Sequence, residues 1–80
     1  MTINVLAFGI AKEILGGNSV SVVLEDGTSA DALKHQLEVQ YPGLKKLSTV
    51  MIAVNNSYAA AGMIIQPGDE VAIIPPVSGG

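Results

Sequence analysis

The last six residues of the sequence carry a chemical group that folding alone does not explain. They are Pro75, Pro76, Val77, Ser78, Gly79 and Gly80. The two prolines end the apolar run before them, because proline has no backbone N–H to donate to a neighbouring strand. The two glycines add nothing to a core, and ordering them costs more backbone entropy than ordering any other residue. The segment is therefore either a frayed end or a group that enters another molecule. In the second case its reactive group is the carboxylate of Gly80.

Other residues with reactive side chains are isolated or have a local structural role. His35 is the one histidine and falls on the predicted exposed face of a helix, which favours a solvated residue over a catalyst or ligand. The acidic pairs at residues 25–26 and 69–70 lie in or beside predicted turns, and no histidine or third acid stands at a spacing that would complete a metal site. Lys45 and Lys46 could steer an acidic partner, although a solvated pair is the simpler explanation. We therefore predict no metal site and no catalytic side chain.

Length and composition indicate one small, well-packed domain. The chain has 80 residues, of which 49% are hydrophobic and 14% charged, and this is too apolar for a disordered segment. It has four lysines, no arginine and a net charge of −3, which argues against binding to nucleic acid. There is no cysteine, and the N-terminus lacks the basic region of a signal peptide, so we expect a cytoplasmic protein. The longest apolar runs are too short to span a membrane, and no membrane contact is expected.

The periodicity of apolar residues predicts strands that alternate with two helices. Strands are expected over residues 2–8, 19–25, 50–54 and 70–74, a weak alanine-rich strand over 57–61, and helices over 9–15 and 30–40. In the longer helix one apolar stripe faces the core, formed by Ala30, Leu33, Leu37 and Tyr41.

Local signals set the ends of these elements. Thr28 or Ser29 is expected to cap the longer helix. In the shorter helix Ile10, Ile14 and Ala11 are expected on the inner side. Residues 55–56 are both asparagine and favour a tight two-residue turn, because asparagine tolerates a positive φ.

The order of the elements predicts an α+β domain of the β-grasp type, with a mixed sheet of four to five strands and one main helix packed across it. The first two strands pair, the helix crosses over, and the last strand can then lie beside the first. In this arrangement the last strand is central and launches the end of the chain from a rigid base. We therefore divide the chain into a β-grasp domain, residues 1–74, and an extended C-terminal tail, residues 75–80.

Several segments resemble one known family. Residues 68–80 read GDEVAIIPPVSGG and resemble the C-terminal signature of the small subunit of molybdopterin synthase, a ubiquitin-like sulfur carrier. Residues 5–13, VLAFGIAKE, resemble the first strand and following helix of that family, residues 28–43 resemble its main helix, and residues 54–55 its next turn. The similarity extends over essentially the whole chain. The departure is in residues 57–66, which are alanine-rich and uncharged where many relatives have acidic residues.

The resemblance implies a chemistry that uses no side chain of this chain. A carboxylate is a poor acylating group, but adenylation with ATP gives it a good leaving group, and a sulfur nucleophile can then displace AMP. By resemblance, a ubiquitin-activating-like adenylyltransferase would activate Gly80 with ATP, and a sulfur donor would convert it to a thiocarboxylate. The tail would enter the large subunit of molybdopterin synthase and give its sulfur to cyclic pyranopterin monophosphate. The chain would then be a sulfur-donating, non-catalytic subunit without a permanently bound cofactor, commonly in a two-plus-two heterotetramer.

Apolar residues near the tail are candidates for docking to that partner. They are drawn from Phe8, Ile73, Ile74 and Val77, and Ile74, Val77 and Phe8 are singled out for contact with a partner. Some apolar residues in these segments must belong to the core, and the remainder are left to form a docking surface.

Three further functions stay open on the sequence. The chain could carry sulfur for another product, such as thiamine or a thiolated tRNA base. It could be a ubiquitin-like modifier that forms isopeptide bonds with lysines of target proteins. It could also be a passive binding module whose tail has no chemistry. The PPVSGG ending resembles the carrier for molybdopterin more than the thiamine-type carriers.

Overall fold

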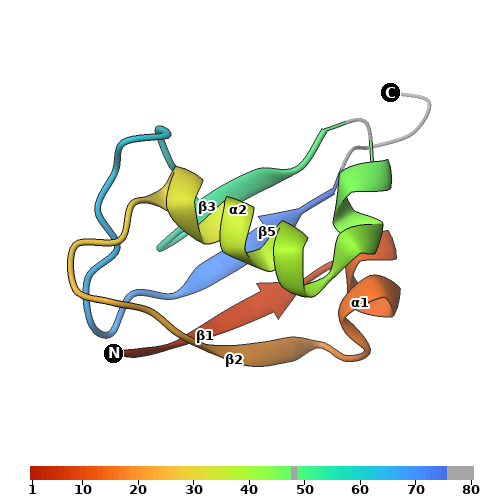
Figure 1. Cartoon of the computed structure of the whole chain (residues 1–80), viewed down its shortest axis with the longest axis horizontal. Coiled ribbons are helices and arrows are strands. Elements are labelled where there is room, and N and C mark those ends of the chain that lie inside the picture. Colours follow the sequence, from red (N-terminus) through yellow and green to blue (C-terminus); the bar gives the residue numbers. More distant parts are fainter. Residues whose placement is uncertain (48, 76–80) are drawn as a thin grey trace.

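The strands form one mixed five-stranded sheet in the order β2-β1-β5-β3-β4, with the main helix α2 across one face (Figure 1). The computed structural model describes residues 1–47 and 49–75. The strands are β1 (Thr2–Ala7), β2 (Ser19–Val23), β3 (Met51–Val54), β4 (Ser57–Tyr58) and β5 (Val71–Ile74). The helices are α1 (Ile10–Leu15), α2 (Ala30–Gln40) and the short 3-10 helix η1 (Pro42–Lys46). The α+β architecture of the β-grasp type is confirmed.

The last strand is central, as the order of elements predicted. β5 runs parallel to β1, with Leu6 in register with Ala72, and antiparallel to β3, with Met51 in register with Ile74. The antiparallel pair of β1 and β2 completes one side of the sheet. Because β5 has a hydrogen-bonded neighbour on each side, its position is fixed by two ladders at once.

One face of the sheet packs on α2 and forms the core. On the sheet, alternate residues of the strands are buried on this side: Ile3, Val5, Ala7, Val22, Ile52, Val54, Val71 and Ile73. On the helix, Ala30, Leu33 and Leu37 are buried, as the predicted stripe requires, and Tyr41 is partly buried at the end of the stripe. Leu44 of η1 is buried at the edge of the same core.

The two candidates for the cap of α2 have different roles. Ser29 is the N-cap, and its side-chain oxygen accepts a hydrogen bond from the N–H of Ala32 at 3.1 Å. Thr28 instead donates its hydroxyl to the carbonyl of Glu25 at 2.7 Å and closes the preceding turn. Within the described part of the chain, no helix combines the length and the hydropathy needed to cross a membrane.

The expected inner side of the short helix was wrong for Ile10. Ile10 is 44% exposed, whereas Ala11 and Leu15 are buried and Ile14 is partly buried. The helix begins at Ile10 after a sharp turn at Gly9, whose φ is 56°. A helix of this length buries one narrow stripe, and the pair at i and i+4, Ala11 and Leu15, occupies it. Ile10 lies outside this stripe and faces solvent.

The alanine-rich segment forms a shorter strand than expected and then turns to the main helix. β4 has two residues, although the N–H of Ala59 still donates to the carbonyl of Ile52. Beyond it, the carbonyls of Ala61 and Met63 accept hydrogen bonds from the N–H groups of Asp31 and Ala30 at 3.0 and 2.7 Å. The first amides of a helix have no partner inside the helix, so this segment satisfies them and leaves the sheet in doing so.

The turn between β3 and β4 is tied to the turn that precedes β5. Asn55 and Asn56 have φ values of 51° and 69°, which confirms the predicted tight turn. The side-chain amide of Asn55 donates to Asp69 at 3.0 Å, and its side-chain oxygen accepts from the N–H of Glu70 at 3.0 Å. Asp69 also accepts from the N–H of Gln66 at 2.8 Å, so its role is local and structural, as expected.

Candidate functional site

The base of the tail is the best-positioned part of the candidate site. Ile74 ends β5, in register with Met51 of β3, and Pro75 follows it partly buried. The preceding residue, Ile73, pairs with Ala7 of β1 and is completely buried. The chain therefore reaches Pro75 from the middle of the sheet, where two neighbouring strands fix its direction.

Most of the predicted tail lies outside the described residues. Five of its positions, together with their predicted roles, belong to that part of the chain: Pro76, Val77, Ser78, Gly79 and Gly80. The modified terminus at Gly80, the insertion of the tail and the division of the chain at residue 74 therefore stay predictions.

Pro75 packs closely over the turn between β1 and α1. A Cβ atom added to Gly9 would lie 3.4 Å from Cγ of Pro75. Gly9 adopts φ 56° and ψ −133°, a conformation that residues with a side chain rarely adopt. The glycine thus allows both the sharp turn and the close approach of the proline. This contact places the first residue of the tail beside the start of α1.

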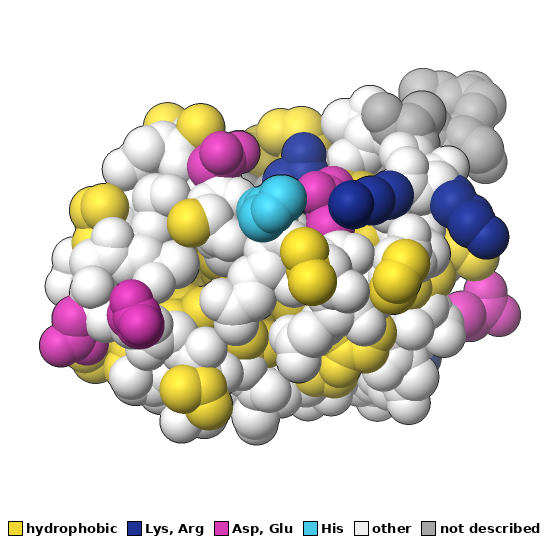
Figure 2. Space-filling model, viewed as in Figure 1, with side chains coloured by type: hydrophobic (Ala, Val, Ile, Leu, Met, Phe, Trp, Pro, Cys, Tyr) yellow, Lys and Arg dark blue, Asp and Glu magenta, His cyan; other side chains and the backbone are white. Residues whose placement is uncertain are grey.

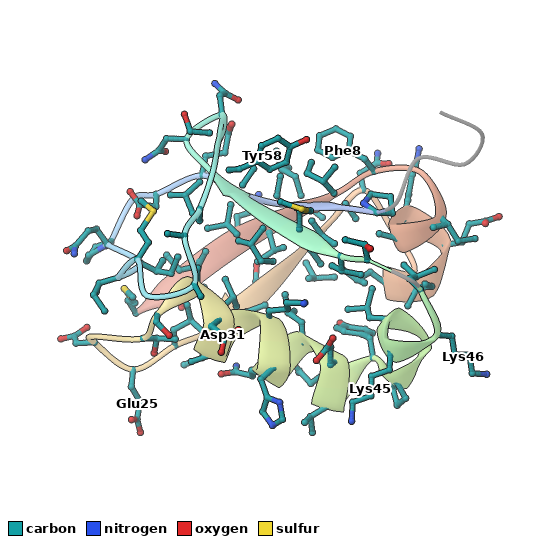
Figure 3. The ribbon with its side chains drawn as sticks, turned by 90° about the horizontal axis from the view of Figure 1, so that it is seen from above. Phe8, Glu25, Asp31, Lys45, Lys46 and Tyr58 are labelled. Carbon is teal, nitrogen blue, oxygen red and sulfur yellow. The ribbon has the colours of Figure 1, made fainter. Side chains whose placement is uncertain are left out.

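Among the described residues no helix covers the sheet face opposite α2, and this face carries an apolar groove of about 350 Å³. Its apolar lining comes from β1, β3, β4 and β5 and from the residue that follows β1: Leu6, Phe8, Ala53, Tyr58, Ala72 and Ile74. Asn56 and Glu70 complete the lining. Figure 3 shows Phe8 and Tyr58 on this open side, with α2 on the other side of the sheet. Phe8 is 50% exposed and Tyr58 is 67% exposed. Large aromatic side chains left this exposed around an apolar groove are typical of a surface that meets a partner.

The two docking candidates that can be placed lie together in this groove. Phe8 and Ile74 line it from the ends of neighbouring parallel strands. A second groove, of about 280 Å³, is lined partly by Phe8, Gly9 and Lys12. Phe8 therefore borders both grooves, and the second one reaches the glycine that supports Pro75. The apolar surface is thus continuous with the base of the tail.

Tyr58 was not singled out from the sequence. It belongs to the segment that looked like a weak, alanine-rich strand, and that composition concealed the one aromatic residue on it. Its register with Ala53 places it on the open face. Two-residue alternation from the Asn55-Asn56 turn would have indicated the same face.

Apart from Glu70, which lines the groove, the remaining candidates lie away from this surface. His35 is exposed on α2, and Lys45 and Lys46 are exposed on η1. Figure 3 shows both lysines on the helix side of the sheet, away from Phe8 and Tyr58. Over residues 1–47 and 49–75 no three side chains of histidine, aspartate or glutamate come together in a way that could hold a metal ion. The acidic pairs therefore form no such cluster in the described residues.

Similarity to known proteins agrees with this geometry. A family model described as the ThiS family matches residues 5–80. A relative from Homo sapiens, named molybdopterin synthase sulfur carrier subunit, is 35% identical over 82 residues, which covers 98% of this chain and 93% of the relative. A relative of the same name from Mycobacterium tuberculosis is 38% identical over 80 residues and covers 98% of this chain and 96% of the relative.

Solved structures share the fold over the whole chain. The crystal structure of SAMP1 from Haloferax volcanii has a TM-score of 0.84 and 25% identity, with 100% of both chains covered. A chain from the complex of subunits 1 and 2 of molybdopterin-converting factor from Helicobacter pylori has a TM-score of 0.69 and 27% identity, again with 100% of both chains covered. Since the family model and these relatives match almost from end to end, the chain belongs to the ThiS family.

Proposed function

We propose that this chain is the sulfur carrier subunit of a molybdopterin synthase, and that it carries sulfur on the carboxyl group of Gly80. The observation that carries the proposal is the match of nearly the whole chain to relatives named molybdopterin synthase sulfur carrier subunit. The position of β5 supports it, because a central strand delivers the end of the chain from a fixed point. In this function the chain is the non-catalytic, sulfur-donating subunit.

The chemistry takes place on the terminal carbonyl carbon. A carboxylate oxygen of Gly80 attacks the α-phosphorus of ATP within an activating adenylyltransferase, and the bond to pyrophosphate breaks. A donor that supplies sulfur at the oxidation level of sulfide then attacks the acyl carbon, and AMP leaves with the oxygen. The resulting thiocarboxylate sulfur attacks a carbon of the pterin precursor, cyclic pyranopterin monophosphate, forms a carbon–sulfur bond there and displaces an oxygen substituent from that carbon. Water then cleaves the acyl–sulfur bond and regenerates the carboxylate.

The fold suits this role because the carrier must present a group rather than transform it. Glycines at the end of the tail offer no side chain that would obstruct entry into another protein's site. Two prolines before them restrict the backbone and reduce the entropy lost on insertion. The acid and base groups belong to the partner in this proposal.

We place the large subunit on the open sheet face, in contact with Phe8, Tyr58 and Ile74. The similar Helicobacter pylori chain was solved as a complex of subunits 1 and 2 of molybdopterin-converting factor. An apolar groove continuous with the base of the tail lets one partner bind the sheet and receive the tail together. A two-plus-two heterotetramer in the cytoplasm is the assembly we propose. The product, molybdopterin, contains a dithiolene, which needs two sulfur atoms. Each carrier holds one sulfur atom, so each product molecule consumes two loaded carriers.

Intact mass spectrometry tests the proposal directly. The chain is incubated with ATP, an activating enzyme of this class and a sulfide source, and its mass is recorded with time. We expect a gain equal to the mass difference between sulfur and oxygen, lost again when the large subunit and the pterin precursor are added. A chain whose mass never changes under these conditions would contradict the proposal. Omission of ATP is the control, and it should prevent the gain.

Deletion of Gly80 separates chemistry from folding. We expect the shortened chain to gain no sulfur and to keep its thermal unfolding midpoint, because the core is formed by residues far from the end. The matched control is Ser78→Ala, which keeps the length of the tail. A large loss of stability on deletion would assign the tail a structural role instead.

A protein modifier is the second candidate, because a structure named SAMP1 is similar over the whole chain, and a related structure is named small archaeal modifier protein 1. A modifier would use the same activated carboxyl group but transfer it to a lysine amine. An extract of cells that produce the chain, probed with an antibody to the chain, distinguishes the two functions. A ladder of larger conjugates supports the modifier, whereas a single band with a sulfur-dependent mass shift supports the carrier.

A further inference from the structure

β2 is an edge strand of the sheet, and its outer backbone groups pair with no other strand among the described residues. At one end of the strand, Met1 and Leu24 exchange backbone hydrogen bonds of 2.8 Å, and at the other the N–H of Ala7 donates to the carbonyl of Asn18. Facing residues of an antiparallel pair alternate between hydrogen-bonded and non-hydrogen-bonded positions. The even-numbered residues of β2 therefore turn their backbone groups toward β1. Those of Ser19, Ser21 and Val23 point away from the sheet.

One of these outward groups already has a partner. The side-chain amide of Gln36, on α2, donates to the carbonyl of Val23 at 3.1 Å. This confirms that the carbonyl of Val23 points outward, as the alternation requires. A carbonyl oxygen has two lone pairs, so it can accept a second hydrogen bond. By the same alternation, the N–H and carbonyl groups of Ser19 and Ser21 face no strand among the described residues.

The edge lacks the features that usually prevent strands of two molecules from pairing. Natural edge strands are protected by lysine, by proline, by a bulge or by being very short. The opposite edge strand, β4, has only two residues. In contrast, residues 16–24 contain no charge and no proline, and the register of β2 with β1 is continuous. Val23 is 73% exposed. Figure 2 shows no lysine or acidic side chain along the middle of the lower margin, where β2 lies in that view.

We propose that two copies of this chain pair through their β2 edges, antiparallel, about a twofold axis at Ser21. Ser21 of each copy then donates to and accepts from Ser21 of the other, and Ser19 exchanges hydrogen bonds with Val23 of the other copy. The strand is nearly symmetric about this point, with valine at positions 20 and 22. The two sheets join into one continuous sheet.

Charge selects the antiparallel direction and favours a second copy as the occupant. Glu25 and Asp26 follow β2 directly. We call the contact between the two β2 strands the seam. In the antiparallel pair the acids of the two copies lie at opposite ends of the seam, beside residues 16–17 of the other copy, which are glycines. A parallel pair would place the same acids of both copies side by side, where like charges repel. Because the edge is uncharged and nearly symmetric, it is complementary to the same edge of a second copy.

The seam leaves the proposed carrier function unobstructed. β2 is separated from β5 by β1, and the apolar groove lies over β1, β5, β3 and β4. Two paired copies would expose two tails and two open grooves. The inference is therefore independent of the proposed function.

Sedimentation of the full-length chain tests the seam. A short edge seam buries little surface and gives a weak dimer, so the mass is followed up to about 1 mM protein. We expect the weight-average mass to rise toward twice the monomer mass. Ser21→Lys and Ser21→Glu should each remain monomeric, because like charges then meet at the axis. An equimolar mixture of the two variants should recover the dimer through opposite charges at the same position.

The control is Asn4→Lys, which places a lysine on the neighbouring strand at the position in register with Ser21. It should dimerise like the unmodified chain, and thermal unfolding should show that all variants are folded. An unmodified chain that stays monomeric throughout would overturn the proposal. So would a Ser21→Lys variant that still dimerises, or a mixture of the two charged variants that stays monomeric.

Discussion

Gly9 and Pro75 are in contact at the point where the tail leaves the domain. A Cβ on Gly9 would lie 3.4 Å from Cγ of Pro75, and Gly9 itself adopts a positive φ of 56°. The turn between the first strand and the first helix therefore supports the first residue of the tail. Strand ladders fix the residues before Pro75, and this contact adds a third constraint at Pro75 itself.

Gly9→Ala is expected to reduce both stability and carrier activity. The backbone conformation of Gly9 is rarely adopted by residues with a side chain, and such strain costs about 1–3 kcal/mol of unfolding free energy. The added methyl group would also lie 3.4 Å from Cγ of Pro75, at the near limit of ordinary van der Waals contact, and we expect even a small shift of Pro75 to slow thiocarboxylate formation. Urea denaturation measures the first effect, and the rate of thiocarboxylate formation by a fixed amount of activating enzyme measures the second.

Gly16→Ala is the matched control for that change. Gly16 also has a positive φ, of 82°, but nothing lies within 4 Å of its added Cβ. It should lose about 1–2 kcal/mol of unfolding free energy through strain. The folded variant should form the thiocarboxylate at the same rate as the unmodified chain. Equal rates for the two folded variants would show that the contact with Pro75 does not position the tail.

Asp69 is expected to stabilise the end of the sheet through its link to Asn55. Asp69→Ala removes the acceptor for the Asn55 amide at 3.0 Å and for the N–H of Gln66 at 2.8 Å. These bonds are exposed, so we expect a loss of about 1–2 kcal/mol of unfolding free energy. Glu70→Ala is the control, because the bond to Asn55 uses its backbone N–H and survives the substitution.

A double-mutant cycle then measures the link itself. Asn55→Ala and Asp69→Ala should be less than additive by about 0.5–1 kcal/mol, since each single change already breaks the shared bond. Strict additivity would mean that the two side chains contribute separately and that the bond between them adds nothing in solution.

Ser29 is expected to contribute to the stability of α2 through its cap. Ser29→Ala removes the oxygen that accepts from the N–H of Ala32, and the usual loss for such a change is about 1 kcal/mol. Ser29→Asp keeps an acceptor and adds a negative charge at the positive end of the helix dipole, so it should restore or exceed the original stability. Equal losses for both variants, measured by thermal unfolding, would exclude the capping bond as the cause.

Elements whose signals are local could be predicted from the sequence. The bounds of α2 agree with the expected residues 30–40, because the capping residue Ser29 directly precedes the helix and the apolar stripe runs along it to Tyr41. The position of β5 beside β1 followed from the order of the elements. In contrast, the first amides of α2 are satisfied by the carbonyls of Ala61 and Met63, which lie far along the chain. No local pattern contains that contact, and for this reason the length of β4 was overestimated.

The residues of the candidate site also divide into those that could be predicted from the sequence and those that could not. Phe8 and Ile74 could be grouped from the sequence because strand order alone brings the two chain segments together. Tyr58 could not, because its place depends on the register of a two-residue strand. The exposure of Ile10 and the burial of Leu15 were missed because the helix has only six residues, too few for its periodicity to identify the buried side.

The open sheet face gives the prediction most specific to the proposed partner. Phe8→Asp places a charge in the apolar groove, and burial of an unpaired carboxylate against a partner is costly. We expect the affinity for the large subunit to fall by at least about tenfold, or about 1.4 kcal/mol, as measured by titration calorimetry. Phe8 is half exposed and outside the core cluster, so the variant should keep its unfolding midpoint. Val39→Asp is the matched control, because Val39 is also an exposed apolar residue, at 62%, but belongs to α2. If both variants bind the large subunit as well as the unmodified chain does, the partner does not use the groove.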